Sequence, residues 1–135
     1  MSAQIDRSRI WWVGLLAVLI ATVANVVLAI VARAVLDISP DFNPLAGNST
    51  VILLTVIGVG LGVIIFYLVS GRSAQPVQTF RSIVLIALLL SFLPDIGMLI
   101  ADLPGATVVS VTTLMIMHVV AAVICYQMLV RLTRA

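Results

Sequence analysis

The sequence predicts an all-α protein, a four-helix transmembrane bundle, and three observations support this fold class. Of the 135 residues, 63% are hydrophobic and 9% are charged. Soluble domains are only about 45–50% apolar. The hydrophobic residues gather in four segments, about 10–35, 51–70, 80–101 and 107–130, and each has roughly the 20 residues with which a helix crosses a bilayer. None alternates with the period of two that barrel strands require. We therefore expect a single integral membrane domain over residues 1–135.

The distribution of charge predicts how this domain is oriented. In an up-down-up-down bundle, one end carries Asp37, Asp41 and Asp102 together with Arg33, and we expect Arg33 to pair with Asp37 four residues away. The remaining basic residues all fall at the opposite end: Arg7, Arg9, Arg72, Arg81, Arg131 and Arg134. The positive-inside rule places that end, with both termini, in the cytoplasm.

The connections between the segments suggest how the helices begin and turn. The first loop ends in Asn48-Ser49-Thr50, which predicts an N-cap for the second helix. The short stretch 102–106, with its Pro-Gly pair, predicts a tight turn that makes the third and fourth helices antiparallel neighbours. Pro94 lies inside the third segment and predicts a kink there, because proline removes one helical hydrogen bond.

Small residues recur at helical spacing on the first two segments. Gly14, Ala17 and Ala21 lie on the first, and Gly58 and Gly62 form a GxxxG pattern on the second. Lipid provides little hydrophobic drive for helix association, so helices in membranes attract one another where small residues let their backbones approach. We therefore expect these five residues to lie at helix contacts.

Polar residues inside the spans are the candidate site. At about 1.5 Å rise per residue, four of them lie roughly 20–24 Å from the cytoplasmic edge, each on a different helix. A fifth, a serine, lies one turn from the acid on the third helix. These candidate residues are Asn25, Thr55, Ser91, Asp95 and His118.

Asp95 must be protonated, paired or reached by water, because an ionised carboxylate in hydrocarbon costs about 3 kcal/mol on insertion scales. His118, on the antiparallel neighbouring helix, is the best candidate partner, with Asn25 completing the set. Such a cluster is typical of a proton relay, a cation site or a ligand pocket. It is also compatible with a purely structural role in fixing helix register.

The inventory of residue types excludes several chemistries. There is no Lys and no Glu, and the single Cys125 allows neither an intrachain disulfide nor a CxxC pair. HExxH and GxSxG motifs are absent. We expect neither a metal site nor a cofactor. Ligation of haem or another pigment by His118, with Met98, Met115 or Met117 as a second ligand, is the weaker alternative. The scattered arginines indicate no binding of nucleic acid.

Several short motifs resemble a known family. The first segment opens with Arg-Ile-Trp-Trp-Val-Gly at 9–14 and contains Asn25, the third contains Ser-Phe-Leu-Pro at 91–94, and the fourth contains Met-His-Val-Val-Ala-Ala at 117–122. Together they resemble an uncharacterised family, a domain of unknown function, of small bacterial four-helix integral membrane proteins. The resemblance implies a bacterial inner-membrane location and one domain, and it implies no activity.

In size the chain is also similar to the small multidrug-resistance transporters. It departs from them because it has no Glu for their membrane-embedded proton and substrate site, and because its arginine bias argues against dual topology.

Two functions follow from these observations. The first is a non-enzymatic protein of the lipid bilayer whose midplane pocket, built on Asp95, His118 and Asn25, takes a small ligand or protons. The second is an accessory or interaction subunit of a larger membrane complex, in which the polar layer is purely structural. Either protein is expected to work as a homo-oligomer or as a subunit of such a complex.

Overall fold

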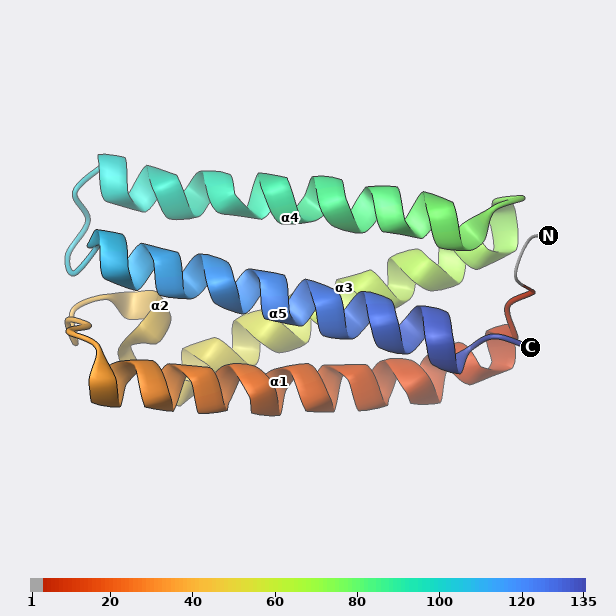
Figure 1. Cartoon of the computed structure of the whole chain (residues 1–135), viewed down its shortest axis with the longest axis horizontal. Helices are drawn as coiled ribbons and strands as arrows, with labels where there is room; N and C mark the ends of the chain where they lie inside the picture. Colours follow the sequence, from red (N-terminus) through yellow and green to blue (C-terminus); the bar gives the residue numbers. More distant parts are fainter. Residues whose placement is uncertain (1–3) are drawn as a thin grey trace.

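The computed structural model describes residues 4–135, most of which are helical. Four long helices, α1 (Ile10–Val35), α3 (Asn48–Arg72), α4 (Pro76–Ile100) and α5 (Val108–Leu132), lie side by side in an elongated bundle (Figure 1). Two short elements, η1 (Arg7–Arg9) and α2 (Asn43–Ala46), complete the described chain. All four long helices are long and apolar enough to cross a membrane. The predicted fold class is confirmed, and the chain is a multi-pass membrane protein.

Two of the long helices begin before the predicted segments do. α3 begins at Asn48 and not at residue 51, and α4 begins at Pro76 and not at residue 80. Pro76 is suited to a first helical turn, where a backbone N–H would have no partner within the helix. Hydropathy missed these first turns because they are polar. α4 then continues unbroken through Pro94 to Ile100.

The predicted N-cap at Asn48-Ser49-Thr50 is wrong, and so is the pairing of Arg33 with Asp37. α3 has Gly47 as its N-cap, without a side-chain cap hydrogen bond. Asn48 instead accepts a hydrogen bond from the Arg33 guanidinium, which also donates to the carbonyl of Leu45 at 3.0 Å. The physical reason is that α2 packs against α3 and α5 with Leu45 buried, and this brings the Leu45 carbonyl and Asn48 within reach of Arg33. Arg33 therefore ties α2 and the start of α3 to α1.

Buried side chains form two hydrophobic clusters along the bundle. The first, towards the chain termini, includes Ile10, Ala21, Val59, Phe66, Phe80 and Cys125. The second, at the other end, includes Ala29, Phe42, Leu45, Val51, Leu114 and Met117. Phe42 lies so close to the turn before α5 that a Cβ on Gly105, whose φ is +75°, would come within 2.5 Å of the Phe42 backbone nitrogen. This turn therefore needs a glycine.

The predicted small residues differ in what they contact. A Cβ on Gly14 would lie 2.4 Å from Cγ1 of Val63, and Ala17 and Ala21 are completely buried, so α1 and α3 approach closely along this line. A Cβ on Gly62 would lie 2.8 Å from Sγ of Cys125 on α5. Gly58 takes no part in this packing, because a Cβ there would meet nothing within 4 Å.

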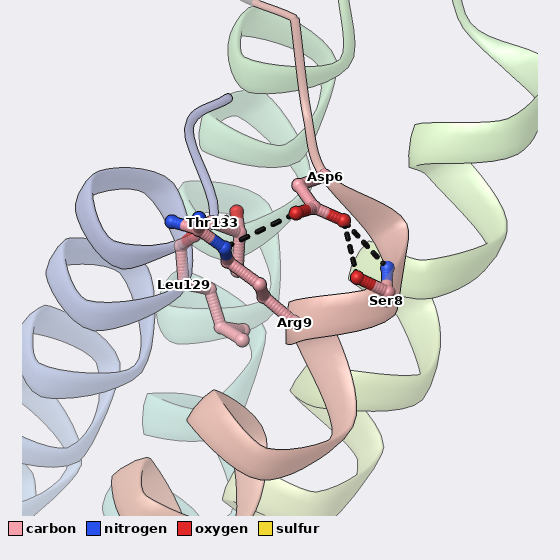
Figure 2. Close-up of polar contacts among 5 residues, drawn as sticks. All are labelled: Asp6, Ser8, Arg9, Leu129 and Thr133. Carbon is pink, nitrogen blue, oxygen red and sulfur yellow. Dashed lines mark hydrogen bonds and ion pairs between the residues drawn. The ribbon is translucent and has the colours of Figure 1, made fainter.

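The two ends of the described chain are joined by a polar contact that we call the terminal clasp, comprising Asp6, Ser8, Arg9 and Thr133 (Figure 2). The Asp6 backbone N–H donates to the carbonyl of Thr133 at 2.7 Å. The Asp6 carboxylate accepts from the Ser8 hydroxyl at 2.5 Å and lies 3.1 Å from the Arg9 guanidinium. The hydrogen bond from Ser8, together with Arg9, holds the pKa of Asp6 below its ordinary value.

Candidate functional site

The polar residues of the spans separate the two hydrophobic clusters. On α1, Asn25 lies between Ala21 of the first cluster and Ala29 of the second. Thr55 on α3 lies between Val51 and Val59, and His118 on α5 follows Met117 of the second cluster and precedes Cys125 of the first. The structure therefore places these residues in one layer across the bundle. A hydrophobic cluster lies on each side of this layer.

Asp95 and His118 meet within this layer. Nδ1 of His118 lies 2.9 Å from Oδ2 of Asp95, and the Asp95 side chain is buried whereas one third (33%) of the His118 side chain is exposed. The two atoms are close but not aligned as in a straight hydrogen bond. If they share one proton the pair is neutral overall, which lowers the cost of placing an acid in hydrocarbon.

Short-range sequence features bring these two side chains together. α4 and α5 are joined by a turn in which Asp102 takes a φ of 51°, and Thr107 and Ser110 form a capping box that starts α5. Because the turn is short, the end of α4 and the start of α5 must be neighbours. Phe92 stacks on the His118 ring with 6.5 Å between ring centroids. Ser91, in contrast, donates to the carbonyl of Leu88 in its own helix at 2.6 Å.

Asn25 forms a separate pair and does not join Asp95 and His118 as the sequence analysis expected. Its Nδ2 donates to Oγ1 of Thr55 at 3.1 Å, which links α1 to α3. Oδ1 of Asn25 is buried and has no hydrogen-bond partner among the described residues. The structure thus divides the polar layer into two pairs, one between α1 and α3 and one between α4 and α5. One amide oxygen is left unpaired.

A cavity of about 360 Å³ lies between α3, α4 and α5. Four of the five candidate residues line it, namely Asn25, Thr55, Ser91 and His118. Asp95 does not line it but contacts His118. The other lining residues are mostly apolar and extend from Pro44 and Val51 at one end to Ile65 and Phe80 at the other. Its volume falls in the range of about 300–1,000 Å³ that is usual for ligand pockets.

The sequence analysis did not predict that small residues leave this space open, and it interpreted one of them, Gly58, as a helix contact. Gly58 on α3, Ala87 on α4, and Ala121 and Ala122 on α5 all line the cavity. A signal was present, because Gly58 lies three residues after Thr55, and Ala121 and Ala122 lie three and four residues after His118. Residues at these spacings share one helix face with the polar side chain. Small residues beside a buried polar residue therefore indicate a cavity as well as a helix contact.

The structure brings together no set of side chains suited to a metal ion among the described residues. Within residues 4–135, no three His, Cys, Asp or Glu side chains are grouped closely enough to hold a metal ion. Met117 lines the cavity beside His118, whereas Met98 and Met115 pack against the second hydrophobic cluster.

Comparison with known proteins identifies the family of the chain. No curated protein and no solved structure is significantly similar to the chain. A family profile, described as a family of unknown function (DUF6069), matches residues 5–135. This match covers nearly the whole chain, including every helix and all five candidate residues. The four-helix membrane protein described above therefore belongs to the DUF6069 family of unknown function.

Proposed function

We propose that this protein binds a small ligand, taken from the surrounding membrane, in the cavity between α3, α4 and α5. His118 and Asn25 contact the ligand and are held in place by Asp95 and by Thr55, respectively, and Thr55 also contacts the ligand. The observation that carries the proposal is that each of the two lies on the cavity wall and is fixed by a second polar residue. Ligand sites combine a mostly apolar wall with a few polar groups whose rotamers are fixed by a supporting residue.

The position of the cavity supports uptake from lipid. Leu54, Gly58 and Leu61 of α3 and Ala87 of α4 line the cavity and are also exposed at the surface of the bundle. The cavity is therefore open on its apolar flank, between two helices that are long enough to cross a membrane. A molecule dissolved in the bilayer can reach His118 and Asn25 without crossing water.

Native mass spectrometry of the protein released from bacterial membranes tests this proposal. We expect the wild-type protein to retain a small-molecule adduct that is lost in Asn25→Leu and in His118→Leu. Thr113→Val is the matched control, because the Thr113 hydroxyl donates to Val109 of its own helix and Thr113 does not line the cavity. The same adduct on all four proteins, or no adduct on any, would overturn the proposal.

Proton movement through Asp95 and His118 is a second candidate function. Its basis is that Asp95 and His118 lie in contact while neither facing atom has a hydrogen bond to any other described residue. Ionisable side chains inside membrane spans, imidazole and carboxylate among them, are the groups from which proton pathways are built. Liposomes that enclose a pH-sensitive dye measure this directly. Proton entry should fall to the protein-free rate in Asp95→Asn, and an unchanged rate would remove this candidate.

The alternative function is that of an interaction subunit in a larger membrane complex. The exposed surface of α4 supports this alternative. Only Pro76, Phe80 and Asp95 of this helix are buried, so most of its surface is free to contact a second copy or a larger membrane complex. Crosslinking through single cysteines introduced along α4 tests this function. If an interaction subunit is correct, crosslinks to one partner form at helical spacing and survive Asp95→Asn.

We also propose a bacterial inner-membrane location with the arginine-rich end in the cytoplasm. This orientation rests on the six arginines of that end and on the positive-inside rule. A fluorescent protein that matures only in the cytoplasm, fused after Ala135, should fluoresce. A dark fusion with a folded membrane domain would reverse the orientation.

A further inference from the structure

We infer that the ligand of this cavity is a long-chain alcohol, with its hydroxyl at Asn25 and Thr55 and its chain extending towards Phe80. This inference rests on the proposed ligand-binding function and specifies the class of ligand. It starts from a polar atom of the cavity wall that has neither a hydrogen-bond partner nor an ion-pair partner among the described residues. Oδ1 of Asn25 is a buried acceptor without a partner, on a side chain that lines the cavity and is only 4% exposed.

The neighbouring hydroxyl makes the match more specific. Oγ1 of Thr55 accepts the hydrogen bond from Asn25, and its own proton is given to no described residue. The pair thus offers one free acceptor and one free donor next to each other. A hydroxyl group donates one hydrogen bond and accepts others, so a single ligand hydroxyl satisfies both. The match also holds if Oδ1 and Nδ2 of the Asn25 amide exchange places. The Thr55 hydroxyl then donates to Oδ1, and Nδ2 is left as the free donor.

The rest of the cavity requires an apolar chain. Between the polar pair and the far end, the wall is formed by Gly62, Ile65, Phe80, Ile83, Val84 and Ala87. One water molecule occupies about 30 Å³ in the liquid, so the 360 Å³ cavity holds about a dozen non-hydrogen atoms. A cavity with such a lining does not fill with water, because each water needs two or more polar partners.

The charges around the cavity disfavour an acidic head group. Among the described residues no arginine lines the cavity, and the one imidazole, His118, already lies against Asp95. A fatty acid would bring a second carboxylate to this imidazole without a cation to balance it. A neutral hydroxyl has no such cost.

Photolabelling in lipid nanodiscs tests the inference. The probe is a primary alcohol of about twelve carbons that carries a diazirine midway along its chain. The alkane and the carboxylic acid of the same length carry the same diazirine. Mass spectrometry of peptides then locates the label. We expect the alcohol to label the stretches 80–87 and 121–125 about tenfold more than the alkane does, as one or two hydrogen bonds would produce.

Variants connect this preference to the polar pair. Asn25→Leu and Thr55→Val should each bring the alcohol-to-alkane ratio close to one, and Thr55→Val keeps the shape of the side chain if Asn25→Leu fails to fold. Ser82→Ala is the control, because Ser82 is exposed, donates to Gln78 of its own helix and does not line the cavity. This variant should label like the wild-type protein.

The outcomes separate this inference from the proposed function. Equal labelling by alcohol and alkane, or stronger labelling by the acid, would overturn the alcohol while the proposed ligand site survives. A preference for the alcohol that persists in Thr55→Val would also overturn it. If none of the three probes labels the cavity stretches, both the alcohol and the proposed ligand site fail.

Discussion

The two outer helices, α1 and α4, lie on opposite sides of α5 and bury very different parts of themselves (Figure 1). Both are long and apolar enough to cross a membrane. α4 buries only Pro76, Phe80 and Asp95. α1 buries a continuous face of mostly small residues: Ile10, Val13, Gly14, Ala17, Ala21, Asn25, Ala29 and Ala32. Hydropathy does not distinguish these helices, whereas the positions of their small residues do.

Because of this difference, α1 stabilises the bundle whereas α4 borders the cavity. α1 and α3 approach where Gly14 meets Val63, and this close backbone contact stabilises the fold. α4 has no such face, and its Leu89 and Leu93 point outward. It is held at two heights, by Phe80 between aromatic rings and by Asp95 against His118. The cavity lies along the face of α4 that carries Ile83, Val84 and Ala87, which is not tightly packed.

The largest expected effect comes from filling the contact between α1 and α3. Gly14→Leu should lower the free energy of unfolding by about 3 kcal/mol, because its side chain would overlap Val63 and the two helices must separate. Gly58→Leu is the matched control and should lower it much less, since nothing lies within 4 Å of the added Cβ and Gly58 borders the open cavity. Thermal unfolding in detergent, followed by circular dichroism, measures both. Equal losses would show that α1 is not the principal support.

Removing the aromatic anchor of α4 should have the next largest effect. The Phe80 ring lies 4.7 Å from Phe66 and 6.1 Å from Tyr126, measured between ring centroids. Phe80→Ala should cost about 2 kcal/mol, less than in a soluble core, because detergent or lipid solvates the exposed ring nearly as well. Leu93→Ala, on the same helix but 62% exposed, should cost little. If the two variants unfold at the same temperature, Phe80 does not anchor α4.

The second attachment of α4 is expected to be weaker. A double-mutant cycle with Asp95→Asn and His118→Gln should give a coupling energy of about 1 kcal/mol, the range found for polar pairs between membrane helices. The reason is that each single variant loses the same 2.9 Å contact. The double variant therefore loses less free energy of unfolding than the sum of the two single losses. Unfolding in detergent supplies the four free energies. Strict additivity would mean that the contact does not hold α4 to α5.

The smallest effect is expected at the terminal clasp, outside both helix contacts. The pKa of Asp6 lies below its ordinary value of 3.8, chiefly because the Ser8 hydroxyl donates to the carboxylate. The clasp is therefore fully stabilising above that ordinary value and loses its stabilisation as the pH falls through the lowered pKa. Tryptophan fluorescence should report this loss through Trp11, which packs on Tyr67. An acid transition of the same size in Asp6→Asn would contradict this assignment.

Much of the fold could be predicted because its causes are local. Hydropathy and length identify the four spans, and the rise of a helix places Asn25, Thr55, Asp95 and His118 at one depth whatever their partners are. The short turn before α5 makes the contact between Asp95 and His118 predictable as well. The polar first turns of α3 and α4 were missed, because polar residues near a membrane surface extend a helix without any signal in hydropathy.

The sequence by itself determined the class, the number of spans and the depth of the polar layer. Tertiary structure decided which side chains contact one another, within that layer and outside it. Asn25 pairs with Thr55, Arg33 reaches Leu45 and Asn48 in place of Asp37, and Gly58 faces open space. The physical reason is that the rotation and tilt of a helix in lipid are set by packing against its neighbours, and the hydropathy of a span that is apolar on every side carries no record of them.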